Sequence, residues 1–409
     1  MSKIDDLMKK YCPNGVEYKK IKEVFTRLKG TPITATRMKE IECEGGEIRI
    51  FAGGKTVIDA KEKDIPNANI TRVPAVLVQS RGVIDFIYYE KPFTFKNEMW
   101  AYTSDNKISV KYLFYVLKNN SRHFREAASG MGALPQISLS ATEDFVIPVP
   151  PLEVQREIVQ VLDSFTMLTA ELTAELTARK KQYEYYRDQL LSFNNVRGGL
   201  TFANPESVRW MTLGDIATVT KLAGFEFTNY VTYSDKGKVI ALRGLNVKDG
   251  KLILNDVKYI DGSDFSKLSR SKLCIGDMLF TYVGTVGQVA LIDENDKYYL
   301  APNVSMIRLQ DENVLPKFMM YYFRTKSFWN EQISKLLQQS SMQNIPMEKI
   351  RKFSLPIPPL AEQERIVTIL DKFDALVNDL SEGLPAEIEA RKRQYEYYRD
   401  KLLSFKKIA

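Results

Sequence analysis

Histidine and cysteine are scarce in this chain. Its 409 residues include one histidine, His123, and three cysteines, Cys12, Cys43 and Cys274, which lie far apart in the sequence. Three scattered thiols are too few for a disulfide framework or a zinc site, so we expect free cysteines and a cytoplasmic protein. A single histidine also argues against histidine-rich metal centres and leaves no credible Ser/His/Asp triad.

Long apolar runs and nucleotide-binding motifs are missing as well. No eighteen consecutive apolar residues occur, and the first residues lack the apolar core of a signal peptide, so we expect no membrane span and no secretory leader. The segment FAGGKTV at 51–57 contains Gly-Lys-Thr, but Arg49 stands where a P-loop needs its first glycine. We therefore expect no catalytic residues and no metal or cofactor site in this chain.

The charge balance is mildly basic. The formal net charge is +7 and the sequence pI is about 8.9. Such a balance is compatible with a nucleic-acid partner but does not by itself require one.

What the chain does contain is an internal repeat. The segment ARKKQYEYYRDQLLSF at 178–193 returns as ARKRQYEYYRDKLLSF at 390–405, with fourteen of sixteen positions identical. Upstream, IPVPPLEVQREIVQVLDSF at 147–165 matches LPIPPLAEQERIVTILDKF at 355–373. The first pair is offset by 212 residues and the second by 208, so the second copy carries a four-residue insertion. The chain is thus two tandem halves, each a variable block followed by a nearly identical helix.

The repeated segments have the apolar spacing of a coiled coil. Apolar and aromatic residues recur at alternating steps of three and four, which predicts a helix over 152–193 and a second one that the insertion, with Gly383 and Pro385, breaks. Two such helices in one chain can pack on each other in antiparallel orientation. The predicted seam consists of Leu162, Phe165, Tyr183, Tyr186, Leu190, Leu370, Phe373, Tyr395, Tyr398 and Leu402.

The outward face of each helix is copied too. Tyr185 and Tyr397 fall away from the seam, beside Arg187 and Asp188 in the first copy and Arg399 and Asp400 in the second. A plain coiled-coil spacer explains the seam but not a duplicated exposed face. We therefore interpret these six residues as two binding sites for one kind of partner protein.

The variable blocks are predicted to be mixed α/β. Short β-branched and aromatic runs such as PAVLVQS and KVIAL alternate with Gly, Asp and Asn turns, and helical patterns precede each Pro-Pro exit. Basic and amide side chains in their turns are candidates for contacts with phosphates and base edges. The candidates are Lys20, Lys22, Arg27, Lys29, Arg37, Lys55, Arg72, Arg81, Gln136, Lys221, Arg243, Lys267, Arg270, Lys272, Tyr282, Gln288, Asn303, Gln343 and Asn344.

These motifs resemble a known family. The PxPPLxxQxxIVxxLDxF pattern, the tandem TAEL tetrapeptides at 169–176 and the repeated QYEYYRD segment are similar to the specificity (S) subunit of type I restriction-modification systems, in the group with tetrapeptide repeats. The resemblance implies two α/β target recognition domains separated by two long antiparallel helices with pseudo-two-fold symmetry. It places recognition domains at 1–150 and 196–358 and conserved helices at 151–195 and 359–409.

The resemblance also implies the partners. Each recognition domain would read one half of a bipartite double-stranded DNA target, and the helices would set the gap and dock two methyltransferase (M) subunits. Motor-nuclease (R) subunits would join the full complex. S-adenosylmethionine, ATP and magnesium would then be cofactors of those partners and not of this chain. Two alternatives stay open at this point: a coiled-coil adaptor that joins two protein-binding domains without DNA, and a methyltransferase or nuclease that acts alone.

Overall fold

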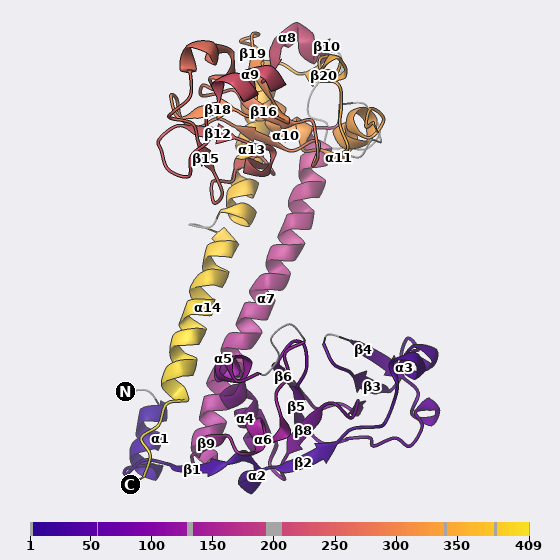
Figure 1. Ribbon diagram of the computed structural model, residues 1–409, viewed down its shortest axis with the longest axis vertical. Helices are drawn as coiled ribbons and strands as arrows, with labels where there is room; N and C mark the ends of the chain where they lie inside the picture. Colours follow the sequence, from indigo (N-terminus) through magenta and orange to yellow (C-terminus); the bar gives the residue numbers. More distant parts are fainter. Residues whose placement is uncertain are drawn as a thin grey trace. The chain divides into compact units, whose positions relative to one another are not determined.

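The computed structural model describes residues 3–54, 56–128, 134–193, 207–338, 342–379 and 383–408 (Figure 1). The chain divides into two compact units. The first consists of Met1–Leu172 together with Ile388–Ala409, and the second of Thr173–Glu387. Each unit therefore contains one variable block and helical segments from both halves of the sequence.

The first unit begins with a helix and continues as a mixed α/β domain that leads into the long helix α7. Its elements are α1 (Lys3–Tyr11), β1 (Glu17–Lys20), α2 (Ile21–Val24), β2 (Thr26–Lys29), α3 (Ala35–Ile41), β3 (Ile48–Phe51), β4 (Val57–Ala60), η1 (Glu62–Asp64), β5 (Ala75–Gln79), β6 (Asp85–Tyr89), β7 (Phe93–Phe95), β8 (Trp100–Thr103), α4 (Lys107–Asn119), α5 (Ser121–Glu126), α6 (Leu139–Glu143), β9 (Val146–Val149) and the first part of α7 (Leu152–Leu190), whose residues from Thr173 onward belong to the second unit; the end of α14 (Gly383–Leu402) also belongs to the first unit.

The second unit repeats this order with additions. Its elements are β10 (Arg209–Thr212), α8 (Leu213–Ile216), β11 (Ala217–Lys221), α9 (Gly224–Tyr230), β12 (Ile240–Leu242), η3 (Gly244–Asn246), β13 (Val247–Lys248), β14 (Lys251–Leu252), β15 (Lys258–Tyr259), η4 (Phe265–Lys267), η5 (Ser269–Ser271), β16 (Met278–Thr281), β17 (Val289–Leu291), β18 (Tyr298–Leu300), β19 (Val304–Leu309), α10 (Pro316–Phe323), α11 (Lys326–Phe328), η6 (Trp329–Ile333), α12 (Met347–Ile350), β20 (Ser354–Ile357), α13 (Leu360–Asn378) and the start of α14 (Gly383–Leu402).

The two units share one sheet topology. A four-stranded antiparallel sheet has the order β2-β8-β5-β6 in the first unit and β11-β19-β16-β17 in the second. A three-stranded sheet, β4-β3-β7 or β15-β12-β18, contains one parallel pair in each case. The prediction of two mixed α/β domains carried on helices is confirmed.

A two-stranded ribbon closes each domain. β1 pairs with β9 so that Tyr18 lies opposite Pro148, and β10 pairs with β20 so that Trp210 lies opposite Pro356. Pro148 and Pro356 are tolerated because both strands of a two-stranded sheet are edge strands, and a Pro-Pro segment follows each ribbon. The first and last strands of each domain are thereby joined before the long helix begins.

The apolar stripes of the helices are buried as the spacing predicts. α7 has 39 residues and is about 59 Å long at 1.5 Å per residue. In the first unit its N-terminal part and the C-terminal part of α14 lie side by side and run in opposite directions (Figure 1). All ten predicted seam residues are buried or half-buried and belong to the two largest apolar cores or pack against them or against each other.

The seam contains the same ring stack twice. Phe165 stacks on Tyr398 in the first unit with centroids 5.5 Å apart, and Phe373 stacks on Tyr186 in the second at 5.8 Å. Phe165 and Phe373 are matching residues of the repeat, as are Tyr186 and Tyr398. Each unit thus combines the phenylalanine of one copy with the tyrosine of the other.

The predicted break in the second helix is confirmed. α13 ends at Asn378 and α14 begins at Gly383. Gly383 has φ +79°, and a Cβ atom there would lie 2.7 Å from the carbonyl oxygen of Leu376, so the position requires glycine. Pro385 lies in the first turn of α14, where the missing N–H has no helical acceptor in any case.

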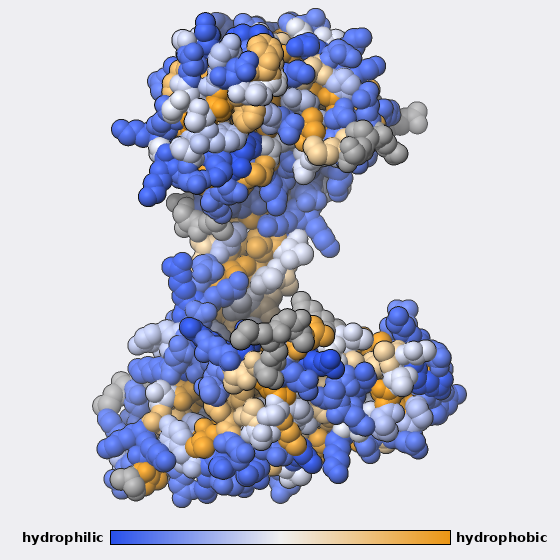
Figure 2. Space-filling model, viewed as in Figure 1, coloured by the Kyte–Doolittle hydropathy of each residue, from blue (hydrophilic) through white to orange (hydrophobic). Residues whose placement is uncertain are grey.

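Surfaces outside these cores are mainly polar. On the face shown in Figure 2, hydrophilic side chains cover most of each unit and apolar side chains are scattered among them. Among the residues that the structure describes, no helix is long and apolar enough to cross a membrane.

A buried glutamine anchors the start of each conserved helix. Gln363 donates to the carbonyl oxygens of Asn313 (2.8 Å) and Pro358 (2.8 Å) and accepts from the Leu315 N–H (2.9 Å). Its counterpart Gln155 donates to Pro150 O (2.7 Å), and its own Oε1 has no hydrogen-bond partner among the described residues. The second anchor therefore satisfies more backbone groups than the first.

We expect this difference to be measurable. Gln363→Leu should lower the free energy of unfolding of its unit by about 3 kcal/mol and Gln155→Leu by about 1 kcal/mol, since each buried hydrogen bond contributes about 1 kcal/mol. Native-state hydrogen exchange of α10 and α4 measures the two effects separately. Equal effects would contradict the assignment of three hydrogen bonds to one anchor and one to the other.

Candidate nucleic-acid interface

In each unit, the tight turn that follows β5 or its counterpart β16 is hydrogen-bonded to a loop. In the first unit the Gly82 N–H donates to Pro135 O (2.8 Å) and the Ile137 N–H donates to Ser80 O (2.9 Å). The backbones of Arg81 and Gln136 form an isolated antiparallel β-bridge. Gly82 has φ +79°, the left-handed conformation that favours glycine. Arg81 and Gln136, which are far apart in the sequence, are thereby brought together.

The second unit has the same construction. The Gly284 N–H, at φ +81°, donates to Gln343 O (2.9 Å), and the Ile345 N–H donates to Tyr282 O (3.0 Å). Val283 bridges to Asn344. Three candidates from the sequence, Tyr282, Gln343 and Asn344, therefore lie together at the place that matches Arg81 and Gln136.

A groove lies beside each turn and loop. The groove of the first unit has a volume of about 730 Å³ and includes three sequence candidates, Arg27, Lys29 and Gln136. The groove of the second unit has a volume of about 410 Å³ and also includes three, Lys221, Tyr282 and Asn344. Lys29 and Lys221 are the last residues of the matching strands β2 and β11, and both are exposed.

The linings of the two grooves differ in chemistry. The first combines charged and amide side chains, among them Asn69, Asn97 and Glu98, with the aromatic ring of Trp100. The second is lined mostly by apolar side chains, namely Val283, Met342, Ile345, Pro346 and Met347. Burial raises the pKa of Tyr282, which favours the neutral phenol, a hydrogen-bond donor and acceptor. Two grooves built alike but lined differently are suited to two different ligands.

Several basic candidates are already paired with acids. Lys20 and Lys22 both contact Asp144, at 3.1 and 2.8 Å, and hydrogen bonds from Lys22 and Lys20 lower the pKa of that carboxyl. The remaining ion pairs are Arg27–Glu143, Arg37–Glu40, Arg72–Glu62, Arg243–Asp256 and Lys272–Asp296. These pairs are at least partly exposed, so each stabilises the fold little; Arg243 is the most buried cation among them, with 23% of its side chain exposed.

The other candidates are dispersed. Gln288 accepts a hydrogen bond from the Asp249 N–H (3.0 Å), so its carbonyl oxygen holds a hairpin. Asn303 has φ +71°, and its backbone carbonyl accepts from the Tyr282 N–H (3.2 Å). Lys267 and Arg270 are exposed on the short helices η4 and η5. Lys55 lies outside the described residues.

The duplicated outward face is only partly as predicted. Tyr185 and Tyr397 are exposed, at 59% and 63%, and Asp400 is exposed. The expectation that Arg187 lies on this exposed face is wrong. Its side chain is buried because the guanidinium lies over the ring of Tyr183, 5.7 Å from the centroid, and Tyr183 itself packs into the core.

Arg187 and its counterpart are held in the same way. Arg187 pairs with Asp188 at 2.9 Å, and Arg399 pairs with Asp400 at 2.8 Å and lies 5.7 Å from the centroid of Tyr395. Asp188 and Arg399 are half-buried. The most exposed side chains that both copies share at this face are therefore the tyrosines.

Some side chains that hold the domains on the helices or line the grooves were not identified from the sequence. Tyr115 donates to Asp163 (2.5 Å) and Tyr321 to Asp371 (2.7 Å), which ties α4 and α10 to the conserved helices. The repeated LDxF motif contained both carboxylates and was the available signal. Trp100 and Met342 in the grooves carried no signal, because only register and loop position bring them there.

The described residues contain no group of three or more His, Cys, Asp or Glu side chains arranged to hold a metal ion. What the geometry does define is a class of protein: two recognition-type domains of one topology, each with a differently lined groove, carried on paired helices.

Comparisons with known proteins agree with this class. The family described as type I restriction modification DNA specificity domain matches residues 13–179 and 205–390. The specificity subunit of the Escherichia coli type I restriction enzyme EcoR124I/EcoR124II is 33% identical over 345 residues, which cover 79% of this chain and 77% of that protein. The chain therefore belongs to the specificity-subunit family of type I restriction-modification systems.

Solved structures show the same fold. A chain from a study of complex assembly and conformational transition of the type I R-M system has a TM-score of 0.58 at 16% identity and covers 96% of this chain and 98% of its own length. The type I S subunit from M. genitalium has a TM-score of 0.55 at 14% identity and covers 95% and 96%.

Proposed function

We propose that this chain is the DNA-reading subunit of a type I methyltransferase complex, in which each domain reads one half of a gapped double-stranded target. The observation that carries the proposal is the pair of matching grooves with different linings. Basic residues at the groove edges would contact phosphates, and amide or aromatic side chains would contact base edges. Because the linings differ, the two half-sites would differ as well.

The helices would set the gap between the half-sites. α7 is continuous through the tetrapeptides at 169–176, so each TAEL unit adds about 6 Å and about 40° of rotation to the helix. The exposed tyrosines Tyr185 and Tyr397 would each dock one methyltransferase subunit. Catalysis, with S-adenosylmethionine, ATP and magnesium, would belong to the methyltransferase and motor-nuclease partners, and this chain would contribute none of it.

The adenine methylome of cells that express this chain with its partners tests the function. We expect one gapped, two-part motif that disappears when the gene is deleted. Insertion of a further TAEL unit after Leu176 should lengthen the gap by about one or two base pairs, at about 3.4 Å per base pair, and leave the bases read unchanged. An unchanged methylome on deletion, with the partners expressed, would favour the adaptor alternative.

The groove lysines should make salt-dependent contacts with DNA. Lys29→Gln and Lys221→Gln are each expected to reduce the slope of log affinity against log salt by about 0.9 for every phosphate that the lysine neutralises. The measurement is DNA binding by the assembled methyltransferase complex at several salt concentrations. Lys63→Gln and Lys236→Gln remove exposed charges outside the grooves and serve as controls. Equal effects of groove and control variants would argue against grooves that bind DNA.

The tyrosine face should determine how many methyltransferase subunits bind. Tyr185→Ala and Tyr397→Ala should each weaken one docking site by about 30-fold, since truncation of an interface tyrosine costs about 2 kcal/mol at a hot spot. Native mass spectrometry should then show one bound subunit for each single variant and none for the double variant. Glu184→Ala and Glu396→Ala, at the neighbouring exposed positions, are controls. Two subunits bound to the double variant would refute the docking assignment.

A further inference from the structure

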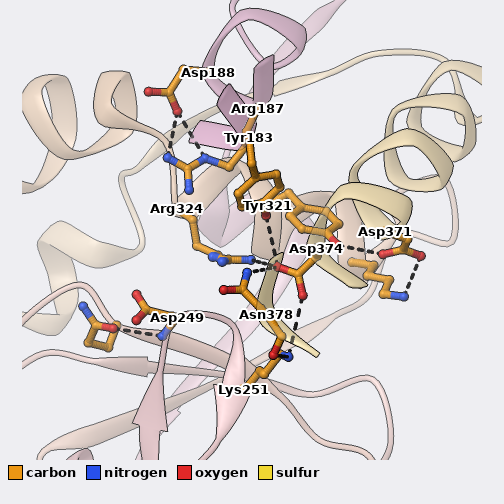
Figure 3. Close-up of polar contacts among 12 residues, drawn as sticks. Tyr183, Arg187, Asp188, Asp249, Lys251, Tyr321, Arg324, Asp371, Asp374 and Asn378 are labelled. Carbon is orange, nitrogen blue, oxygen red and sulfur yellow. Dashed lines mark hydrogen bonds and ion pairs between the residues drawn. The ribbon is translucent and has the colours of Figure 1, made fainter. Parts of the chain in front are cut away.

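A network of polar side chains surrounds Asp374 in the second unit (Figure 3). Asp374 lies in α13, one turn before the helix ends, and is largely buried, with 16% of its side chain exposed. Its carboxylate contacts the Tyr183 hydroxyl (3.3 Å), Arg324 Nη1 (3.5 Å), Asn378 Nδ2 (3.1 Å) and Lys251 Nζ (3.8 Å). We call Asp374 with these four partners the Asp374 hub. It joins α7, α13 and β14 to the C-cap residue of α10.

Lys251 makes a second contact that ties the hub to the end of the helix. Its Nζ donates to the carbonyl oxygen of Asn378 (3.2 Å), the last residue of α13. A cation at a helix C-terminus interacts favourably with the free carbonyls and with the helix dipole. The hub therefore closes α13 at the point where the conserved helix is interrupted.

The hairpin that carries Lys251 is fixed on its other side to the recognition sheet. Its turn has Asp249 at φ +49° and Gly250 at φ +84°, and the Gly250 N–H donates to Val289 O (2.9 Å). A Cβ on Gly250 would lie 3.0 Å from Arg324 Nη1, so the turn packs closely on the hub. Because Gln288 holds the Asp249 N–H, the hub is connected to the β16–β17 hairpin, whose turn carries Tyr282.

The described residues of the first unit form no such network at the matching positions, although the neighbouring contacts are shared. The Tyr115–Asp163 and Tyr321–Asp371 contacts match, as do Lys111–Asp163 and Lys317–Asp371 at 2.8 and 2.7 Å. At the position of Asp374, however, the first unit has Thr166, whose hydroxyl donates to Leu162 O (2.9 Å).

The position of Arg324 also differs. In the first unit Lys118 stands there and pairs with Asp85 of β6 at 2.6 Å. The hub thus occurs in the repeat in which the conserved helix is broken, while α7 runs without a break. An uninterrupted helix needs no such reinforcement at this point, but a helix that ends at Asn378 does.

We propose that the Asp374 hub is a positioning device that fixes the second recognition domain on its broken helical support, and that it thereby determines how strictly the complex selects the gap length of its target. The proposal rests on the gapped DNA recognition proposed above. It assigns Asp374, Arg324 and Lys251 no contact with the bases. Loss of the hub would let the domain rotate on α13, so that targets with a wrong gap are bound more readily while the half-site sequences stay the same.

The test uses the assembled methyltransferase complex and duplexes that carry the two half-sites from the methylome at the native gap and at one base pair more or less. For Asp374→Ala we expect the affinity ratio of native to altered gap to fall by about tenfold, the effect of removing charge-assisted hydrogen bonds. Lys251→Met, at an exposed position, should lower the ratio by a smaller factor. Thr166→Val, the matching change in the first unit, should leave it unchanged.

The outcomes distinguish failure of the hub proposal from failure of the proposed function on which it rests. If the wild-type complex shows no preference for a gap, the proposed function fails. If the wild type selects its gap and both hub variants retain that ratio, the hub proposal is overturned. Hydrogen exchange of α13 shows whether Asp374→Ala folds. If it does not fold, the affinity ratio of Lys251→Met alone decides whether the hub proposal stands. A variant that alters the bases read, and not the gap, also overturns the proposal, because it would place the hub in sequence recognition.

Discussion

Burial of the apolar stripe on α7 is the constraint on which the rest of the structure depends. A helix of 39 residues presents a stripe that one small domain does not cover, so the chain supplies a second copy of the same sequence to pack against it. The exchanged ring stacks, Phe165 on Tyr398 and Phe373 on Tyr186, follow directly. Once the seam pairs the two copies, each unit must contain segments from both halves of the chain.

Repetition of the frame leaves the variable parts free to diverge. The turn at Gly82 or Gly284 and its loop are held by backbone hydrogen bonds, which do not depend on the side chains that line the groove. One scaffold therefore carries a groove with several charged and amide side chains in the first unit and a groove with mostly apolar side chains in the second. The Asp374 hub shows that the shared framework also diverges, next to the point where the second conserved helix is interrupted.

Much of the frame was predictable from the sequence. The alternating three- and four-residue spacing of apolar residues predicted the seam, and all ten seam residues are buried or half-buried. The insertion with Gly383 and Pro385 predicted the helix break, because each residue has a strong local conformational preference. The burial of Arg187 was not predictable from the sequence. A heptad position gives the direction in which a side chain leaves the helix, but not that the Arg187 side chain folds back over the ring of Tyr183.

The sequence by itself determined the repeat, the helices and their break, and the two mixed domains, because these follow from local preferences and from periodicity. Only the tertiary structure decided which of the candidate side chains meet in a groove and which are held elsewhere. Lys29 and Gln136, or Lys221 and Asn344, are far apart in the sequence and come together through strand register and loop docking. Asp374 and Lys251 meet in the same way, since a contact across such a separation depends on packing that no local pattern contains.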